Sequence, residues 1–67
     1  MTMPNERTRA VLYTEQFLVA LLNAAETPRV PLEVRRRAGR CLRHYPHPYE
    51  MKQAAKDVPN VFGPPDA

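Results

Sequence analysis

Residues 4–24 read PNERTRAVLYTEQFLVALLNA, and this stretch sets the architecture because proline occurs only at its first position. A proline is tolerated in the first turn of a helix, and Glu6 suits the positive end of the helix dipole. At about 100° per residue, the apolar residues fall mainly on one broad face. This predicted core face comprises Ala10, Val11, Thr14, Phe17, Leu18, Leu21, Leu22 and Ala25. The stretch therefore predicts a long amphipathic helix.

Proline pairs bound a second helical segment. They are Pro28 with Pro31 before it and Pro46 with Pro48 after it. Because a proline restricts the preceding residue and has no N–H, we expect helices over residues 31–44 and 48–57. The first of these should pack through Val34, Ala38, Cys41, Leu42 and Tyr45, and the second through Met51, Ala54, Ala55 and Val58.

No period-2 alternation of apolar and polar residues indicates a strand. The predicted fold class is therefore all-α, a small three-helix domain with a long first helix, a basic second helix and a short third helix. The domain should cover residues 1–62, and residues 63–67 should form a flexible C-terminal tail.

The small size of the chain creates a stability problem. With 67 residues and one cysteine, Cys41, it can form neither a second domain nor an internal disulfide. Small domains of this kind usually gain stability from a metal or from another chain. Leu12 and Val19 project opposite the predicted core face, and we expect them to support self-association as a homodimer. The plain alternative is that they are two ordinary exposed apolar residues.

Few residues suggest catalysis or metal binding. Cys41, His44 and His47 follow a Cys-x2-His-x2-His spacing that resembles a zinc site only weakly, since Cys41 lies on the apolar face and Pro46 turns the chain before His47. No nucleophile comes with both a base and an orienting group, and two glycines cannot build a phosphate loop. We predict a protein that is not an enzyme and has no metal, cofactor or small-molecule substrate.

The basic residues gather in one segment. Five arginines occupy nine residues of the second predicted helix: Arg35, Arg36, Arg37, Arg40 and Arg43. Guanidinium groups pair well with phosphates and carboxylates, so this face is the candidate contact for a partner or for phosphate. Three alternatives stay open: an acidic protein, a nucleic acid, or only water, as on any charged helix face.

The start of the chain, Met1 to Glu6, lacks the basic and apolar parts of a secretory signal. The longest apolar run, Phe17 to Leu22, is too short to cross a membrane. A cytoplasmic location is the expectation, with no membrane partner.

Three phrases of the sequence resemble those of a family of short, uncharacterised proteobacterial proteins. They are Met3 to Val11, Glu26 to Pro28 and Leu42 to Pro46, which read MPNERTRAV, ETP and LRHYP. The resemblance implies one compact bacterial domain and transfers no functional residue. Together these features predict a small interaction or accessory protein that binds a protein partner or itself, with nucleic-acid binding as the alternative.

Overall fold

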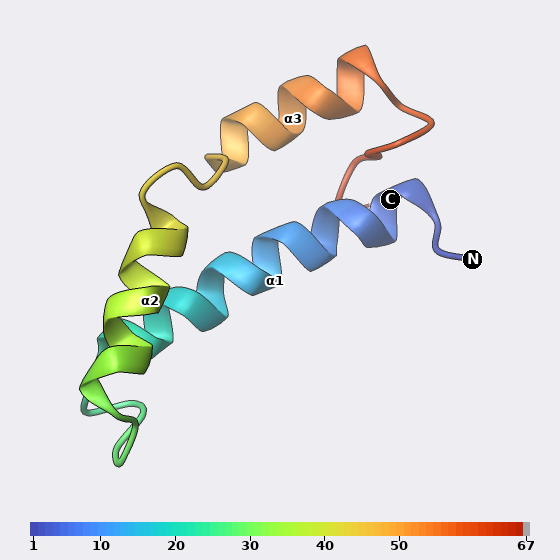
Figure 1. The fold of residues 1–67 in the computed structure, drawn as a ribbon. Coiled ribbons are helices and arrows are strands. Elements are labelled where there is room, and N and C mark those ends of the chain that lie inside the picture. Colours follow the sequence, from blue (N-terminus) through green and yellow to red (C-terminus); the bar gives the residue numbers. More distant parts are fainter. Residues whose placement is uncertain (67) are drawn as a thin grey trace. The chain divides into compact units, whose positions relative to one another are not determined.

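The computed structural model describes residues 1–66 and contains three α-helices. They are α1 (Pro4–Leu22), α2 (Leu32–Leu42) and α3 (Pro48–Asp57) (Figure 1). No strand occurs in this part of the chain, so the predicted all-α class is confirmed. None of the described helices has the length and apolarity that a membrane-spanning segment needs.

The ends of α1 and α2 lie earlier than predicted for reasons visible in the backbone. After Leu22, the side-chain oxygen of Asn23 accepts a hydrogen bond from the Ala25 N–H at 3.0 Å. Such local bonds compete with helical ones. After Leu42, the Tyr45 N–H donates to the Leu42 carbonyl at 3.3 Å, a tight turn that leads into Pro46.

Helices α1 and α3 begin with the same local pattern, a proline at the first position and a glutamate two residues later. Glu6 Oε1 accepts from the Met3 N–H at 2.8 Å, and Glu50 Oε1 accepts from the His47 N–H at 2.9 Å. These bonds satisfy backbone donors next to each helix start. His47 Nδ1 also accepts from the Tyr49 N–H at 3.3 Å, so His47 caps α3 with its side chain.

We expect His47→Ala to lower the free energy of unfolding by about 1 kcal/mol, because the first turn of α3 loses its side-chain cap. His47→Asp should restore the stability, since aspartate is a strong N-cap. Urea unfolding followed by circular dichroism measures both effects. Equal midpoints for the wild type and His47→Ala would show that the cap contributes nothing.

Packing divides the chain into two compact units. Unit 1 combines Met1–Tyr13 with the chain from Pro46 onward, and unit 2 is Thr14–Tyr45. Helix α1 contributes its first part to unit 1 and its last part to unit 2. The structure thus describes two small units where the sequence predicts one three-helix domain over residues 1–62.

The core of unit 1 is formed around Thr8, which is fully buried, and Met51, which is 5% exposed. Thr8 Oγ1 donates to the Pro4 carbonyl at 3.3 Å, so its hydroxyl is satisfied within α1. Gly63 is buried beside the start of α1. Thr8 is absent from the predicted core face because helical periodicity places it to one side of that face.

The segment over residues 63–66, predicted as part of a flexible tail, contacts α1 in the structure, and its flexibility stays a prediction. In Figure 1 the C-terminal segment, drawn in red, returns to the start of α1, drawn in blue. Arg7 Nε donates to the Val61 carbonyl at 2.7 Å, and Arg9 Nη1 donates to the Pro65 carbonyl at 3.0 Å. These bonds hold residues 61–65 against α1. Residue 67 of the predicted tail lies outside the described residues.

Unit 2 is a helical hairpin whose core is small. Ala38 of α2 is 3% exposed, and Leu18, Leu21 and Leu42 are half-buried. Several residues predicted to form the core are exposed. In unit 2 they are Thr14, Phe17, Leu22, Ala25, Val34 and Cys41, and in unit 1 they are Ala10 and Val58. Each element packs over only part of its apolar face, since short segments cannot surround one another in so small a unit.

Candidate functional site

Helix α2 carries the candidate site on its exposed side. Its start is set by Pro31, which has an extended backbone (φ −60°, ψ 146°) and lacks an N–H to continue a helix. Four of the predicted site residues are exposed: Arg36, Arg37, Arg40 and Arg43. We call these four residues the arginine face.

Arg35 lies apart from the arginine face, and its predicted role in binding a partner or phosphate stays a prediction. Its side chain is half-buried in unit 2. Arg35 Nη1 donates to the Leu21 carbonyl at 2.6 Å and to Thr27 Oγ1 at 2.9 Å, and Nη2 donates to the Thr27 carbonyl. The guanidinium therefore stabilises the C-terminal end of α1 and the loop that follows it.

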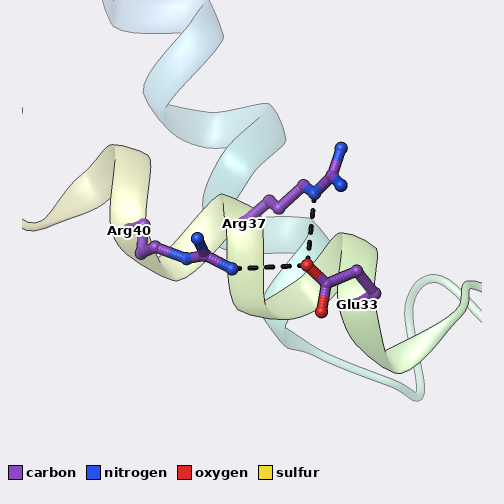
Figure 2. Close-up of polar contacts among 3 residues, drawn as sticks. All are labelled: Glu33, Arg37 and Arg40. Carbon is purple, nitrogen blue, oxygen red and sulfur yellow. Dashed lines mark hydrogen bonds and ion pairs between the residues drawn. The ribbon is translucent and has the colours of Figure 1, made fainter.

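Glu33 is the carboxylate that pairs with the arginine face (Figure 2). A single oxygen, Glu33 Oε1, lies 3.3 Å from Arg37 Nε and 3.3 Å from Arg40 Nη2. The three side chains are 53%, 74% and 63% exposed, in that order. Exposed pairs of this kind contribute about 0–1 kcal/mol. Arg37 and Arg40 can therefore exchange this shared carboxylate for an external one at little cost.

The other two members of the arginine face, Arg36 and Arg43, make no side-chain hydrogen bond or ion pair with any described residue. Four positive charges and the one negative charge of Glu33 leave a net charge of +3 on this surface. A potential of one sign attracts anionic groups and raises their association rate. The arrangement suits the binding of carboxylates or phosphates.

Large apolar side chains are also exposed in unit 2. The exposed fractions are 62% for Phe17, 52% for Val19, 49% for Leu22, 63% for Leu32 and 39% for Val34. Isolated exposed apolar residues are common in folded proteins. Here they accompany a unit whose only buried apolar residue among those described is Ala38. A partner that covers them would add burial that the unit lacks.

Leu12 and Val19, which are predicted to support self-association, lie in different units of the structure. Leu12 lies in unit 1 and is half-buried, whereas Val19 lies in unit 2 and is 52% exposed. The inward side of α1 in unit 1 contains Thr8, and Leu12 follows it one helical turn later. Leu12 is therefore not on an exposed stripe, and only Val19 stays available for contact with another chain.

Arg29 is a feature that the predicted site residues omit. Its φ is 67°, and no other non-glycine residue among residues 1–66 has a positive φ. It follows Pro28 in a turn, as in type II turns that need positive φ at the third residue. For an arginine this conformation costs about 1–2 kcal/mol. The prolines on either side of Arg29 indicate a break between helices, but the positive φ depends on how the loop folds.

The loop around Arg29 is held by side-chain bonds to its backbone. Thr27 Oγ1 donates to the Asn23 carbonyl at 3.0 Å, and Arg35 binds the carbonyl of Thr27. Arg29 itself is exposed. The loop thus presents a further positive charge in unit 2 from a fixed backbone conformation.

The possible zinc ligands are not gathered. Among residues 1–66 no three His, Cys, Asp or Glu side chains lie where they could hold one metal ion. Cys41 is an exposed free thiol, and His47 is engaged in capping α3. His47 also lies against Tyr49, with ring centroids 4.7 Å apart.

Comparison of the chain with protein-family models, curated proteins and solved structures gave no significant match. The resemblance to short proteobacterial proteins therefore stays a prediction. The features that bear on function are the four exposed arginines of the arginine face and the exposed apolar side chains of the same unit.

Proposed function

We propose that this chain is a small interaction protein that binds an acidic partner protein through unit 2, with the arginine face as the main electrostatic contact. One observation carries the proposal: of four exposed guanidinium groups only two pair with a carboxylate, that of Glu33, and large apolar side chains are exposed in the same unit. Protein interfaces are enriched in arginine and aromatic residues, which supports this pairing of charge and apolar area.

The spacing of the arginines suggests the form of the partner. Arg36, Arg40 and Arg43 follow an i, i+4, i+7 pattern, which places them on one side of α2. At about 1.5 Å per residue, Arg36 and Arg43 are separated by roughly 10 Å along the helix. An acidic helix with carboxylates at the same spacing would match this row, and its apolar side chains would cover residues such as Phe17 or Leu32.

A nucleic acid is the second candidate because guanidinium groups also bind phosphates bidentately. The exposed apolar side chains favour a protein, since a phosphate backbone gives them nothing to pack against. The two candidates differ in salt dependence. Binding to a duplex loses affinity steeply with salt through counterion release, whereas a protein interface with apolar contacts loses less.

The test uses two fluorescent probes, a helical peptide with glutamates at i, i+4 and i+7 together with leucines, and a DNA duplex. We expect the peptide to bind more tightly than the duplex at about 200 mM salt. Arg36→Gln with Arg43→Gln should weaken peptide binding about tenfold, because it removes the two free guanidinium groups. Anisotropy titration measures both affinities.

The matched control is Lys52→Gln with Lys56→Gln on α3, which removes the same charge without touching the arginine face. An equal loss of peptide affinity in both double variants would show that net charge alone causes the effect, and it would contradict the proposal. Tighter, strongly salt-dependent binding of the duplex would favour the nucleic-acid alternative. Failure of both probes to bind would leave the arginine face as a solvated surface.

Self-association through unit 2 stays open beside a separate partner, and the exposure of Val19 favours it. Sedimentation velocity over a range of protein concentrations distinguishes the monomer from the homodimer. If the homodimer uses this side of α1, Val19→Asp should shift the chain to the monomer. An unchanged sedimentation coefficient would remove Val19 from any such contact.

A further inference from the structure

Unit 1 contains a groove of about 520 Å³ that plays no part in the proposed function. It is lined by Lys52, Ala55, Lys56, Pro64, Pro65 and Asp66. Pockets that take small organic molecules have volumes of roughly 300–1,000 Å³. We propose that this groove binds an amphiphilic monocarboxylate, with the carboxylate between the two lysines and the apolar body over Ala55 and the prolines.

The apolar wall of the groove is held in place by the rest of unit 1. The Pro65 carbonyl accepts a hydrogen bond from Arg9 Nη1 at 3.0 Å. Gly63 is buried so closely that a Cβ there would lie 3.0 Å from the Asn5 nitrogen. Both Ala55 and Pro65 are half-buried. The wall is therefore set before a ligand arrives, which lowers the entropy cost of binding.

The charged residues that line the groove favour a ligand with one negative charge. Lys52 and Lys56 are one turn apart on α3, and neither forms an ion pair with a described residue. Asp57, the carboxylate next to Lys56, instead accepts from Gln53 Nε2 at 3.1 and 3.2 Å. Asp66 adds one negative charge to the lining. The two lysines and one aspartate of the lining have a net charge of +1. A ligand with one negative charge neutralises it, whereas a ligand with two would leave an excess negative charge.

The experiment titrates the full chain with octanoate, octyl phosphate, octanol and acetate, and follows backbone amide signals by NMR. We expect octanoate to bind more tightly than the other three and to shift signals of residues 52–56 and of Asp66. Octanol lacks the charge, acetate lacks the apolar body, and octyl phosphate carries more than one charge at neutral pH. Tighter binding of octyl phosphate would replace the carboxylate with a phosphate and overturn the proposal as stated.

Two variants with opposite expected signs test the roles of the charges. Lys52→Gln with Lys56→Gln should weaken octanoate binding about tenfold, whereas Asp66→Asn should strengthen it a few-fold, because a like charge is removed. The Arg36→Gln, Arg43→Gln variant should bind octanoate as the wild type does. Since no residue of α2 lines the groove, this result is independent of the peptide and duplex titrations.

Octanoate affinity that is the same in the lysine variant, or that falls equally in the arginine variant, would overturn the groove as a specific site. Circular dichroism of each variant confirms that the helices are retained. The substituted side chains are exposed and make no side-chain hydrogen bond with any of residues 1–66, so the fold should tolerate the changes.

Discussion

Replacement of Arg35 by alanine should lower the free energy of unfolding by about 2–4 kcal/mol. The guanidinium donates to the carbonyls of Leu21 and Thr27 and to the Thr27 hydroxyl. Without it, the last turn of α1 and the loop lose charge-assisted hydrogen bonds, and carbonyls in a partly buried region lose their donor. Such a loss is a large fraction of the stability of a small domain. Urea unfolding followed by circular dichroism measures it.

Arg36→Ala is the matched control because it removes the same side chain from the next position of α2. Arg36 is exposed and makes no side-chain bond with a described residue, so we expect a change within about 0.5 kcal/mol. Arg35→Lys should fall between the two, since an ammonium cannot reproduce the fork of a guanidinium. Equal unfolding midpoints for Arg35→Ala and Arg36→Ala would show that the bonds of Arg35 contribute nothing to stability.

Substitution of each glycine by alanine should have opposite effects. At Gly63 the added Cβ would lie 3.0 Å from the Asn5 nitrogen and 3.3 Å from the Pro4 carbonyl carbon, both backbone atoms. Because a backbone cannot yield as a flexible side chain does, Gly63→Ala should destabilise the chain by about 1–3 kcal/mol. The C-terminal segment should also detach from α1, which limited proteolysis can detect.

Gly39 provides the control within the same chain. A Cβ there would meet only the Leu22 side chain, at 3.8 Å, which is an ordinary contact. Alanine favours a helix over glycine by about 1 kcal/mol, so Gly39→Ala should be stabilising. Neither glycine has a positive φ, and backbone conformation therefore cannot explain a difference between them. Destabilisation of both variants by the same amount would contradict the close packing of Gly63.

The interaction surfaces could be read from the sequence only in part. Arg36, Arg37, Arg40 and Arg43 were predicted as exposed contacts and are exposed in the structure. The groove in unit 1 had no sequence signal, because Lys52 and Pro65 are brought together only when the C-terminal segment returns to α1. Leu12 was misplaced because helical periodicity identifies which residues share a face but not which face another segment covers.

The sequence by itself determined the all-α class and the positions of the helices. Prolines remove backbone donors and restrict their neighbours, so their effect is local and does not depend on the rest of the fold. Tertiary structure alone decided that Arg35 turns inward, that Thr8 is buried and that the segment after residue 62 packs on α1. The physical reason is that each outcome depends on segments distant in sequence, which become neighbours only after the chain has folded.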